Sequence, residues 1–84
     1  MLGKSDTPRV FGRVLRALRV ERGLSQEALG FEAGVQRNYI SLLERGINQP
    51  TISVIFKLST ALGIRPGALV ELVEIECLKH SERR

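Results

Sequence analysis

The stretch that decides the fold is residues 24–46, LSQEALGFEAGVQRNYISLLERG. Ser25 is a residue type that caps helix N-termini, and the apolar residues behind it follow helical spacing until Gly34 ends the pattern. A second helical pattern begins almost at once, over residues 36–45, and Gly46 closes it. The sequence therefore predicts two short helices joined by a tight turn, which must cross at a steep angle.

The rest of the chain carries the same helical periodicity. Apolar residues spaced three and four apart predict helices over about residues 8–22, between Thr51 and Gly63, and from Pro66 to about residue 79. No stretch shows the alternation of a strand. We therefore predict an all-α, compact five-helix domain over residues 8–79, between a flexible lead-in (1–7) and a flexible tail (80–84).

Composition limits the class of protein. The 84 residues suffice for one domain, and its 43% hydrophobic content is ordinary for a folded one. A formal net charge of +4 favours a polyanionic partner, either nucleic acid or an anionic membrane. No apolar run reaches the ~18 residues of a membrane span. The single cysteine, Cys77, excludes an internal disulfide and fits a reducing compartment, so we expect a cytoplasmic protein.

Catalytic patterns are missing from the sequence. It has no glycine-rich phosphate loop and no cluster of residues at metal-ligand spacing, and it holds one histidine and one cysteine. His80 has no companion ligand near it in the sequence. We therefore expect no enzyme activity, no metal and no cofactor.

The quoted segment resembles the lambda-repressor-like, or XRE-type, helix-turn-helix family. The resemblance rests on Leu24–Leu29, Ala33–Val35, Tyr39–Ser41 and Leu43–Gly46, and continues through Asn48, Pro50, Thr51, Leu58–Leu62 and Gly63–Ile64. It covers roughly residues 9–70 in register, which is far more specific than an isolated motif. It implies that the second and third helices form the helix-turn-helix and that the third lies in the major groove of double-stranded DNA.

The third helix offers candidate base-reading residues. Ile40 and Leu43 fall on its inward side, which leaves outward the polar residues Gln36, Arg37, Asn38 and Ser41. An arginine can bond bidentately to guanine, and asparagine or glutamine to adenine. The alternative is a polar face that is merely solvated.

The resemblance implies further contacts to DNA phosphates. The matching positions are Gln26, Tyr39, Arg45, Asn48, Gln49 and Thr51. Some have a structural alternative, since Thr51 is also a helix cap and Asn48 a turn former. For Arg13 and Arg16 a solvated face is favoured over phosphate contact.

One pair of charged residues has a structural role in the family. The resemblance implies that Arg19 pairs with Glu44 and ties the first helix to the third. Two positions depart from the family pattern: Gln36 stands where serine or threonine often caps the third helix, and Ala28 stands where glutamate is common. Both weaken local caps, and neither threatens the fold.

The last helix has more apolar residues than one buried side needs. We expect a homodimer interface at Leu69, Leu72, Ile75 and Leu78, with simple closure of the core as the alternative. Cys77 in the same helix is expected to be a small buried residue. A dimer would read a pseudo-palindromic operator with half-sites about 34 Å apart.

The expected function is transcriptional regulation. This compact form resembles restriction-modification controller proteins and short phage-type repressors, and we expect no small-molecule effector. The alternative is an antitoxin-like interaction module that neutralises a partner protein and regulates its own gene.

Overall fold

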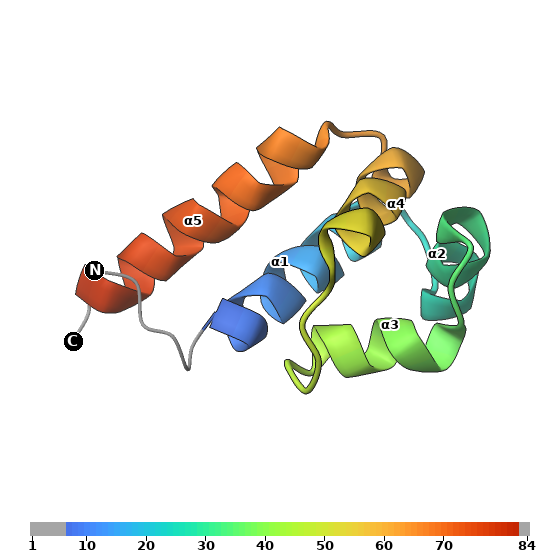
Figure 1. Ribbon diagram of the computed structural model, residues 1–84, viewed down its shortest axis with the longest axis horizontal. Coiled ribbons are helices and arrows are strands. Elements are labelled where there is room, and N and C mark those ends of the chain that lie inside the picture. The colour runs from blue at the N-terminus through green and yellow to red at the C-terminus, as the bar shows by residue number, and fades with distance from the viewer. Residues whose placement is uncertain (1–6, 83–84) are drawn as a thin grey trace.

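The computed structural model describes residues 7–82, which form five helices (Figure 1). They are α1 (Thr7–Glu21), α2 (Gln26–Ala33), α3 (Arg37–Glu44), α4 (Ile52–Leu62) and α5 (Pro66–Glu82). This part of the chain contains no strand, so the predicted all-α fold is confirmed. Helix α5 ends at Glu82, three residues beyond the end predicted from the sequence. Residue 7 of the predicted lead-in (1–7) is the first residue of α1, and residues 1–6 and 83–84 lie outside the described residues.

Helix ends follow the capping residues identified in the sequence. The Ser25 Oγ accepts the Ala28 N–H at 3.0 Å, and the Thr51 Oγ1 accepts the Val54 N–H at 3.2 Å. Gly34, with φ of 73°, ends α2 in the left-handed conformation that only glycine adopts freely. This conformation turns the chain sharply, so that only three residues separate α2 from α3.

The core is mainly aliphatic and draws on all five helices of the described region. Its members are Val10, Phe11, Val14, Leu15, Leu29, Ala33, Ile40, Leu43, Leu58, Leu62, Leu69, Val73 and Cys77. The predicted burial of Cys77 is confirmed. The one buried polar residue in that region, Ser59, donates its hydroxyl to the Ile55 carbonyl at 2.6 Å, so its burial leaves no hydrogen bond unmade.

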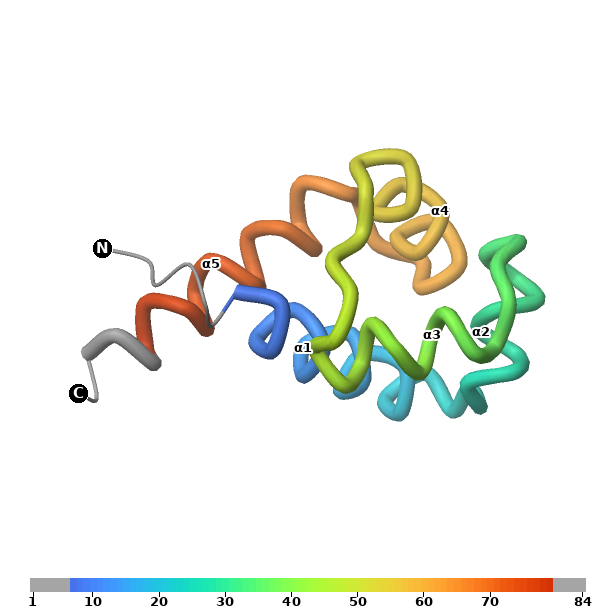
Figure 2. The backbone as a smooth tube through the Cα atoms, turned by 60° about the horizontal axis from the view of Figure 1, so that its bottom comes forward, coloured from blue at the N-terminus to red at the C-terminus, as the bar shows by residue number. Residues whose placement is uncertain are grey.

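Helix α1 occupies the centre of the arrangement. It packs against α3 on one side and α5 on the other, while α2 contacts both α3 and α4 (Figures 1 and 2). Within residues 7–82 no single helix is long and apolar enough to cross a membrane, and α4 and α5 pass that test only as a pair bent by 102°.

A glycine permits the close approach of α1 to α3. A Cβ atom placed on Gly12 would lie 2.5 Å from the carbonyl oxygens of both Leu43 and Glu44. These atoms belong to the backbone of α3 and cannot rotate away. The crossing of the two helices therefore requires glycine at position 12, and α3 takes its place relative to α1 from this contact.

We predict that Gly12→Ala destabilises the protein by about 3 kcal/mol, because the added methyl group would force α1 and α3 apart. The matched control is Gly67→Ala in α5, where an added Cβ meets nothing within 4 Å. That substitution should stabilise the protein by about 0.5–1 kcal/mol through helix propensity. Urea unfolding followed by circular dichroism, at one protein concentration, gives both values. Equal and favourable effects at the two positions would contradict the close helix crossing.

Candidate nucleic-acid interface

Helices α2 and α3 cross steeply at one end of the molecule and leave one side of α3 open (Figure 1). The inner side of α3 is anchored by Ile40 and Leu43, which are fully buried as predicted. The turn before it is tight as well, since a Cβ on Gly30 would lie 2.7 Å from the Val35 carbonyl oxygen. The position of α3 is thus fixed by burial on one side and by a compact turn at its start.

A partly buried polar network ties α3 to α1 and α2. The Arg19 guanidinium donates from Nε to one Glu44 carboxylate oxygen at 2.6 Å and from a terminal nitrogen to the other at 3.1 Å. Its second terminal nitrogen bonds the Leu24 carbonyl at 2.7 Å. The Gln26 amide also donates to the Glu44 carboxylate, at 3.1 Å. The geometry confirms the predicted Arg19–Glu44 pair and adds α2 to it through Gln26.

The Arg19 guanidinium keeps its charge over a wide pH range. The hydrogen bonds that it donates to Glu44 raise the pKa of Arg19, burial opposes this effect, and the attraction of the carboxylate adds to it. A raised pKa means that the contribution of the Arg19 charge to stability is complete at neutral pH and is lost only as the pH rises through the pKa of the folded state. Around neutrality, the network does not respond to pH through this arginine.

The open side of α3 carries the predicted base-reading residues. Gln36, Arg37 and Asn38 are exposed at the start of the helix, and Ser41 is half-buried one turn later. Gln36 is the N-cap residue but makes no capping bond with its side chain, as its departure from the family pattern suggested. Its amide is therefore not committed to the helix. The Ser41 hydroxyl accepts a hydrogen bond from the Arg45 Nε at 3.2 Å.

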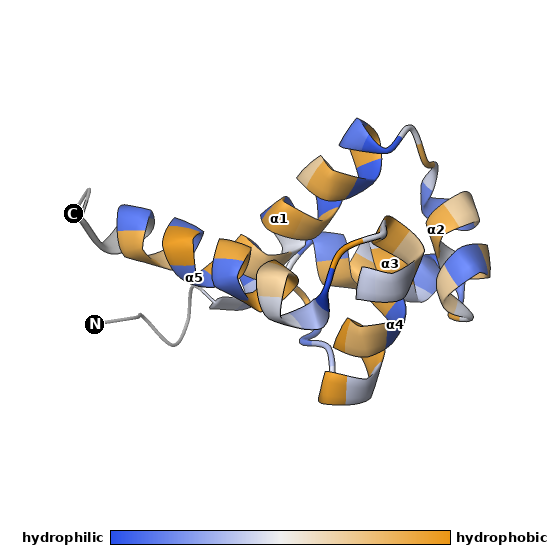
Figure 3. Ribbon diagram, turned by 90° about the horizontal axis from the view of Figure 1, so that it is seen from above, coloured by the Kyte–Doolittle hydropathy of each residue, from blue (hydrophilic) through white to orange (hydrophobic). Residues whose placement is uncertain are grey.

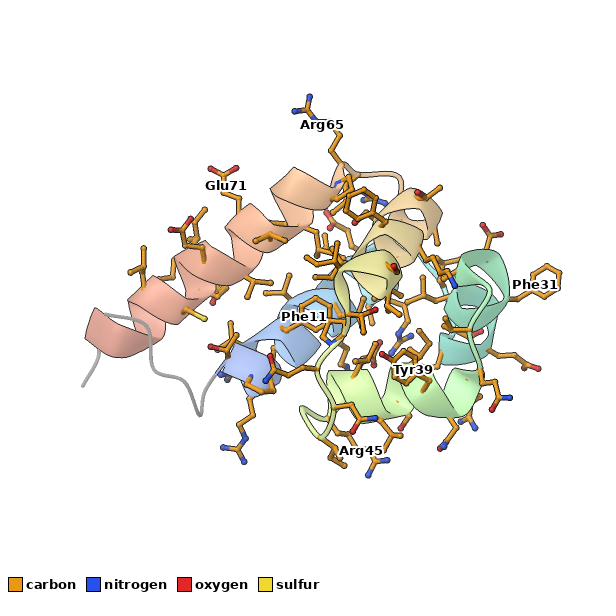
Figure 4. All side chains as sticks on the ribbon, in the orientation of Figure 1. Phe11, Phe31, Tyr39, Arg45, Arg65 and Glu71 are labelled. Atoms are coloured by element: carbon orange, nitrogen blue, oxygen red, sulfur yellow. The ribbon has the colours of Figure 1, made fainter. Side chains whose placement is uncertain are left out.

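The predicted phosphate-binding residues occupy several environments around α3. Arg45, Gln49 and Thr51 are exposed, whereas Tyr39 and Asn48 are half-buried. In Figure 4, Tyr39 lies on the side of α3 that faces the domain, and Arg45 projects away on the other side. The Thr51 oxygen accepts the capping bond of α4, which leaves the hydroxyl hydrogen for another acceptor.

A helix-turn-helix family model matches residues 15–69, which include both crossing helices and the network that fixes them. The chain belongs to the helix-turn-helix family. The resemblance found in the sequence is thereby confirmed, and this helix-turn-helix protein is a DNA-binding transcriptional regulator.

Restriction-modification controllers are among the similar proteins. Control protein C.BamHI from Bacillus amyloliquefaciens is 39% identical over 67 residues, which span 79% of this chain and 83% of that protein. The crystal structure of the controller C.AhdI from Aeromonas hydrophila superposes with a TM-score of 0.72 at 45% identity, over 74% of this chain and 94% of that one. The controller C.Esp1396I gives a TM-score of 0.79 at 28% identity, over 88% of this chain and 96% of that one.

The expected interface residues of α5 divide into two groups. Leu69 is fully buried in the helix-turn-helix domain itself, so its assignment to a dimer interface is wrong. Leu69, Val73 and Cys77 follow one another at intervals of four residues and form a stripe that packs into the core. In contrast, Leu72, Ile75 and Leu78 are 39%, 42% and 44% exposed.

Some contacts of the site were not found from the sequence. The bond from Gln26 to Glu44 could not be foreseen, because glutamine lacks a charge that would mark its partner. The Arg22 Nε bonds the Leu62 carbonyl at 2.6 Å and joins the C-terminal ends of α1 and α4. Gly12 did leave a signal, since a glycine inside a helical pattern often marks close packing.

We predict that Glu44→Gln destabilises the protein by about 3 kcal/mol, because it leaves the Arg19 guanidinium without its charged partner in a site where its side chain is 11% exposed. The matched control is Glu76→Gln, which breaks the exposed 3.4 Å pair with Lys79 and should change stability by less than about 0.5 kcal/mol. Thermal unfolding of both variants makes the comparison. Similar small losses would show that the network does not hold α3.

Proposed function

We propose that this protein is a homodimeric, sequence-specific regulator that binds a pseudo-palindromic operator, in the manner of a restriction-modification controller or a short phage-type repressor. The carrying observation is the two-sided character of α3. Its inner residues are fully buried, while its outer residues are polar and exposed. An exposed helix of this kind can present hydrogen-bonding groups to base edges in the major groove.

Base reading is assigned to Gln36, Arg37, Asn38 and Ser41. Arg37 and Asn38 are the strongest candidates, because both are exposed in the first turn of α3. Arg37 has the donor geometry for guanine, and Asn38 can both donate to and accept from adenine. Ser41 is more restricted, since its hydroxyl already accepts a bond from Arg45.

Phosphate binding is assigned to Gln26, Tyr39, Arg45, Asn48, Gln49 and Thr51. The Gln26 amide nitrogen carries two hydrogens, of which one bonds Glu44 and the other is available to a phosphate oxygen. Gln26 is also the first residue of α2, where the backbone N–H groups favour an anion. One residue would thus link the position of α3 to the position of the DNA backbone.

The dimer is assigned to the exposed apolar side of α5, around Leu72, Ile75 and Leu78. Leu72 and Ile75 also line a groove of about 520 Å³ between α5 and α1, together with Val10, Val14 and Leu18. The C-terminal half of α5 extends beyond the other helices, with apolar residues along it (Figure 3). A second copy related by a two-fold axis would cover this surface and place two copies of α3 on one side of the dimer.

The alternative is an antitoxin-like module that chiefly neutralises a partner protein. The similarity to restriction-modification controller proteins favours a transcriptional regulator instead. For such a regulator we expect no enzyme activity, no cofactor and no small-molecule effector. Its place would be the cytoplasm, where the DNA of a bacterial cell lies.

Selection of bound duplexes from a randomised DNA library, at near-physiological salt, tests the function. A homodimer that reads bases should enrich a motif with two-fold symmetry. Salt-sensitive binding without any enriched motif would contradict sequence-specific regulation and favour the partner-binding alternative.

We predict that Arg37→Ala weakens binding to the selected operator by about 1–3 kcal/mol and relaxes the preference at one position of each half-site. The control is Arg65→Ala, which removes the same charge. Figure 4 shows Arg65 on the opposite side of the molecule from Arg45 and α3. Fluorescence anisotropy with operator and single-base variants measures both effects. If the base preferences of the two variants were the same, Arg37 would not read bases.

We predict that Ile75→Glu shifts the protein toward monomer, because it places a charge on an apolar surface that the partner would cover. The control is Phe31→Ser, which alters an 88% exposed phenylalanine on α2, outside this surface. Sedimentation velocity over a range of protein concentrations distinguishes the two. An unchanged profile for Ile75→Glu would place the interface elsewhere.

A further inference from the structure

Three arginines surround a small cavity where the N-terminal end of α1 meets the C-terminal end of α3. The cavity measures about 320 Å³ and is lined by Arg9 and Arg13 of α1, Glu44 of α3 and Arg45, the C-cap residue of α3. Figures 1 and 2 both show these two helix ends side by side. The family resemblance marked only Arg45 of these arginines, and the sequence favoured a solvated face for Arg13.

The charges of Arg9 and Arg45 are not balanced by the acid beside them. Both carboxylate oxygens of Glu44 are bonded to Arg19, and one of them also accepts from Gln26. Within the described residues, Arg9 and Arg45 form no ion pair. The Arg45 bond to Ser41 uses only Nε, which leaves both terminal nitrogens of the guanidinium as donors. The cavity therefore presents donors and positive charge to an anion.

The backbone holds the cluster together. A Cβ on Gly46 would lie 2.9 Å from the Cα and the Cγ of Arg9, so the loop after α3 packs directly against Arg9. Gly46 adopts a φ of 75°, and this left-handed conformation allows that contact. Arg45 is its neighbour in the chain. The closeness of Arg9 to Arg45 is thus set by backbone packing, although both side chains are exposed.

The position of the cluster relates it to DNA. Helix α3 has eight residues and is about 12 Å long, so Arg45 lies about one helix length from the residues at its start that are assigned to base reading. A helix in the major groove is flanked by phosphate backbones, which residues at its end can contact. Arg45 projects from the side of α3 that faces away from the domain (Figure 4), so the cluster is continuous with the open side of α3.

We propose that Arg9 and Arg45, in the cavity that Arg13 also lines, bind one phosphate group of the DNA backbone, outside the helix-turn-helix itself. Guanidinium groups suit this ligand because they donate paired, charge-assisted hydrogen bonds to phosphate oxygens. The pocket clamps α1 onto the duplex and adds to affinity without adding to base preference. The proposal rests on DNA binding through α3, as proposed above.

The test compares the salt dependence of binding for Arg9→Ala, Arg9→Lys and the control Arg65→Ala, on the selected operator and on a random duplex of the same length. Loss of one phosphate contact should lower the slope of log affinity against log salt by about one per protomer, on both duplexes. Arg9→Lys keeps the charge and should keep most of the slope. Arg65→Ala should leave the slope near that of the unaltered protein. Circular dichroism and sedimentation of each variant check that fold and assembly are kept.

A second measurement identifies the phosphate. Single phosphates of the operator are replaced in turn by neutral methylphosphonates, and binding of the unaltered protein and of Arg9→Ala is compared. One replacement should weaken the unaltered protein and leave Arg9→Ala unaffected. If every replacement weakens both proteins alike, or if Arg9→Ala has the slope of Arg65→Ala, the pocket does not bind phosphate. Failure of the proposed function is a separate result, because the unaltered protein would then bind operator and random duplex equally.

Discussion

The carboxylate of Glu44 is the point at which three helices are joined. It belongs to α3, it is held by the guanidinium of Arg19 from α1, and it accepts the amide of Gln26 from α2. Such a pair gains little over an apolar contact of equal size, but removing one partner is costly because a partly buried charge remains. The interaction therefore acts mainly to fix how α3 lies against its neighbours, and every functional assignment above depends on that position.

Close backbone contacts, in addition to the ion pair, fix the position of α3 against α1. Gly12 lets α1 touch the carbonyl groups of α3, and Gly46 lets the loop after α3 touch Arg9. Both contacts involve the C-terminal end of α3 or the loop just after it, and they bring the start of α1 to the end of α3. Consequently a helix outside the helix-turn-helix motif contributes side chains to the surface that we propose faces DNA. Helix α3 is held by burial, by the ion pair and by close backbone contacts, which suits the fixed presentation that base recognition requires.

Helix α5 has a buried apolar side and an exposed apolar side. Its stripe of Leu69, Val73 and Cys77 is buried in the core, whereas Leu72 and Ile75 remain exposed beside the groove along α1. A domain of this size has a limited core, so covering this surface with a second copy would add stability and specificity of DNA recognition together.

The sequence by itself determined the helices, their caps and the motif. Ser25, Thr51 and Gly34 mark helix ends through local hydrogen bonds and backbone conformation, which are properties of a few adjacent residues. The family pattern also identified Arg19 and Glu44 as a pair. Tertiary structure alone decided that Leu69 is core, that Gln26 bonds to Glu44, and that Arg9 and Arg45 line one cavity. These facts depend on how helices far apart in the chain pack, and periodicity shows which residues share one side of a helix but not which neighbour will cover it.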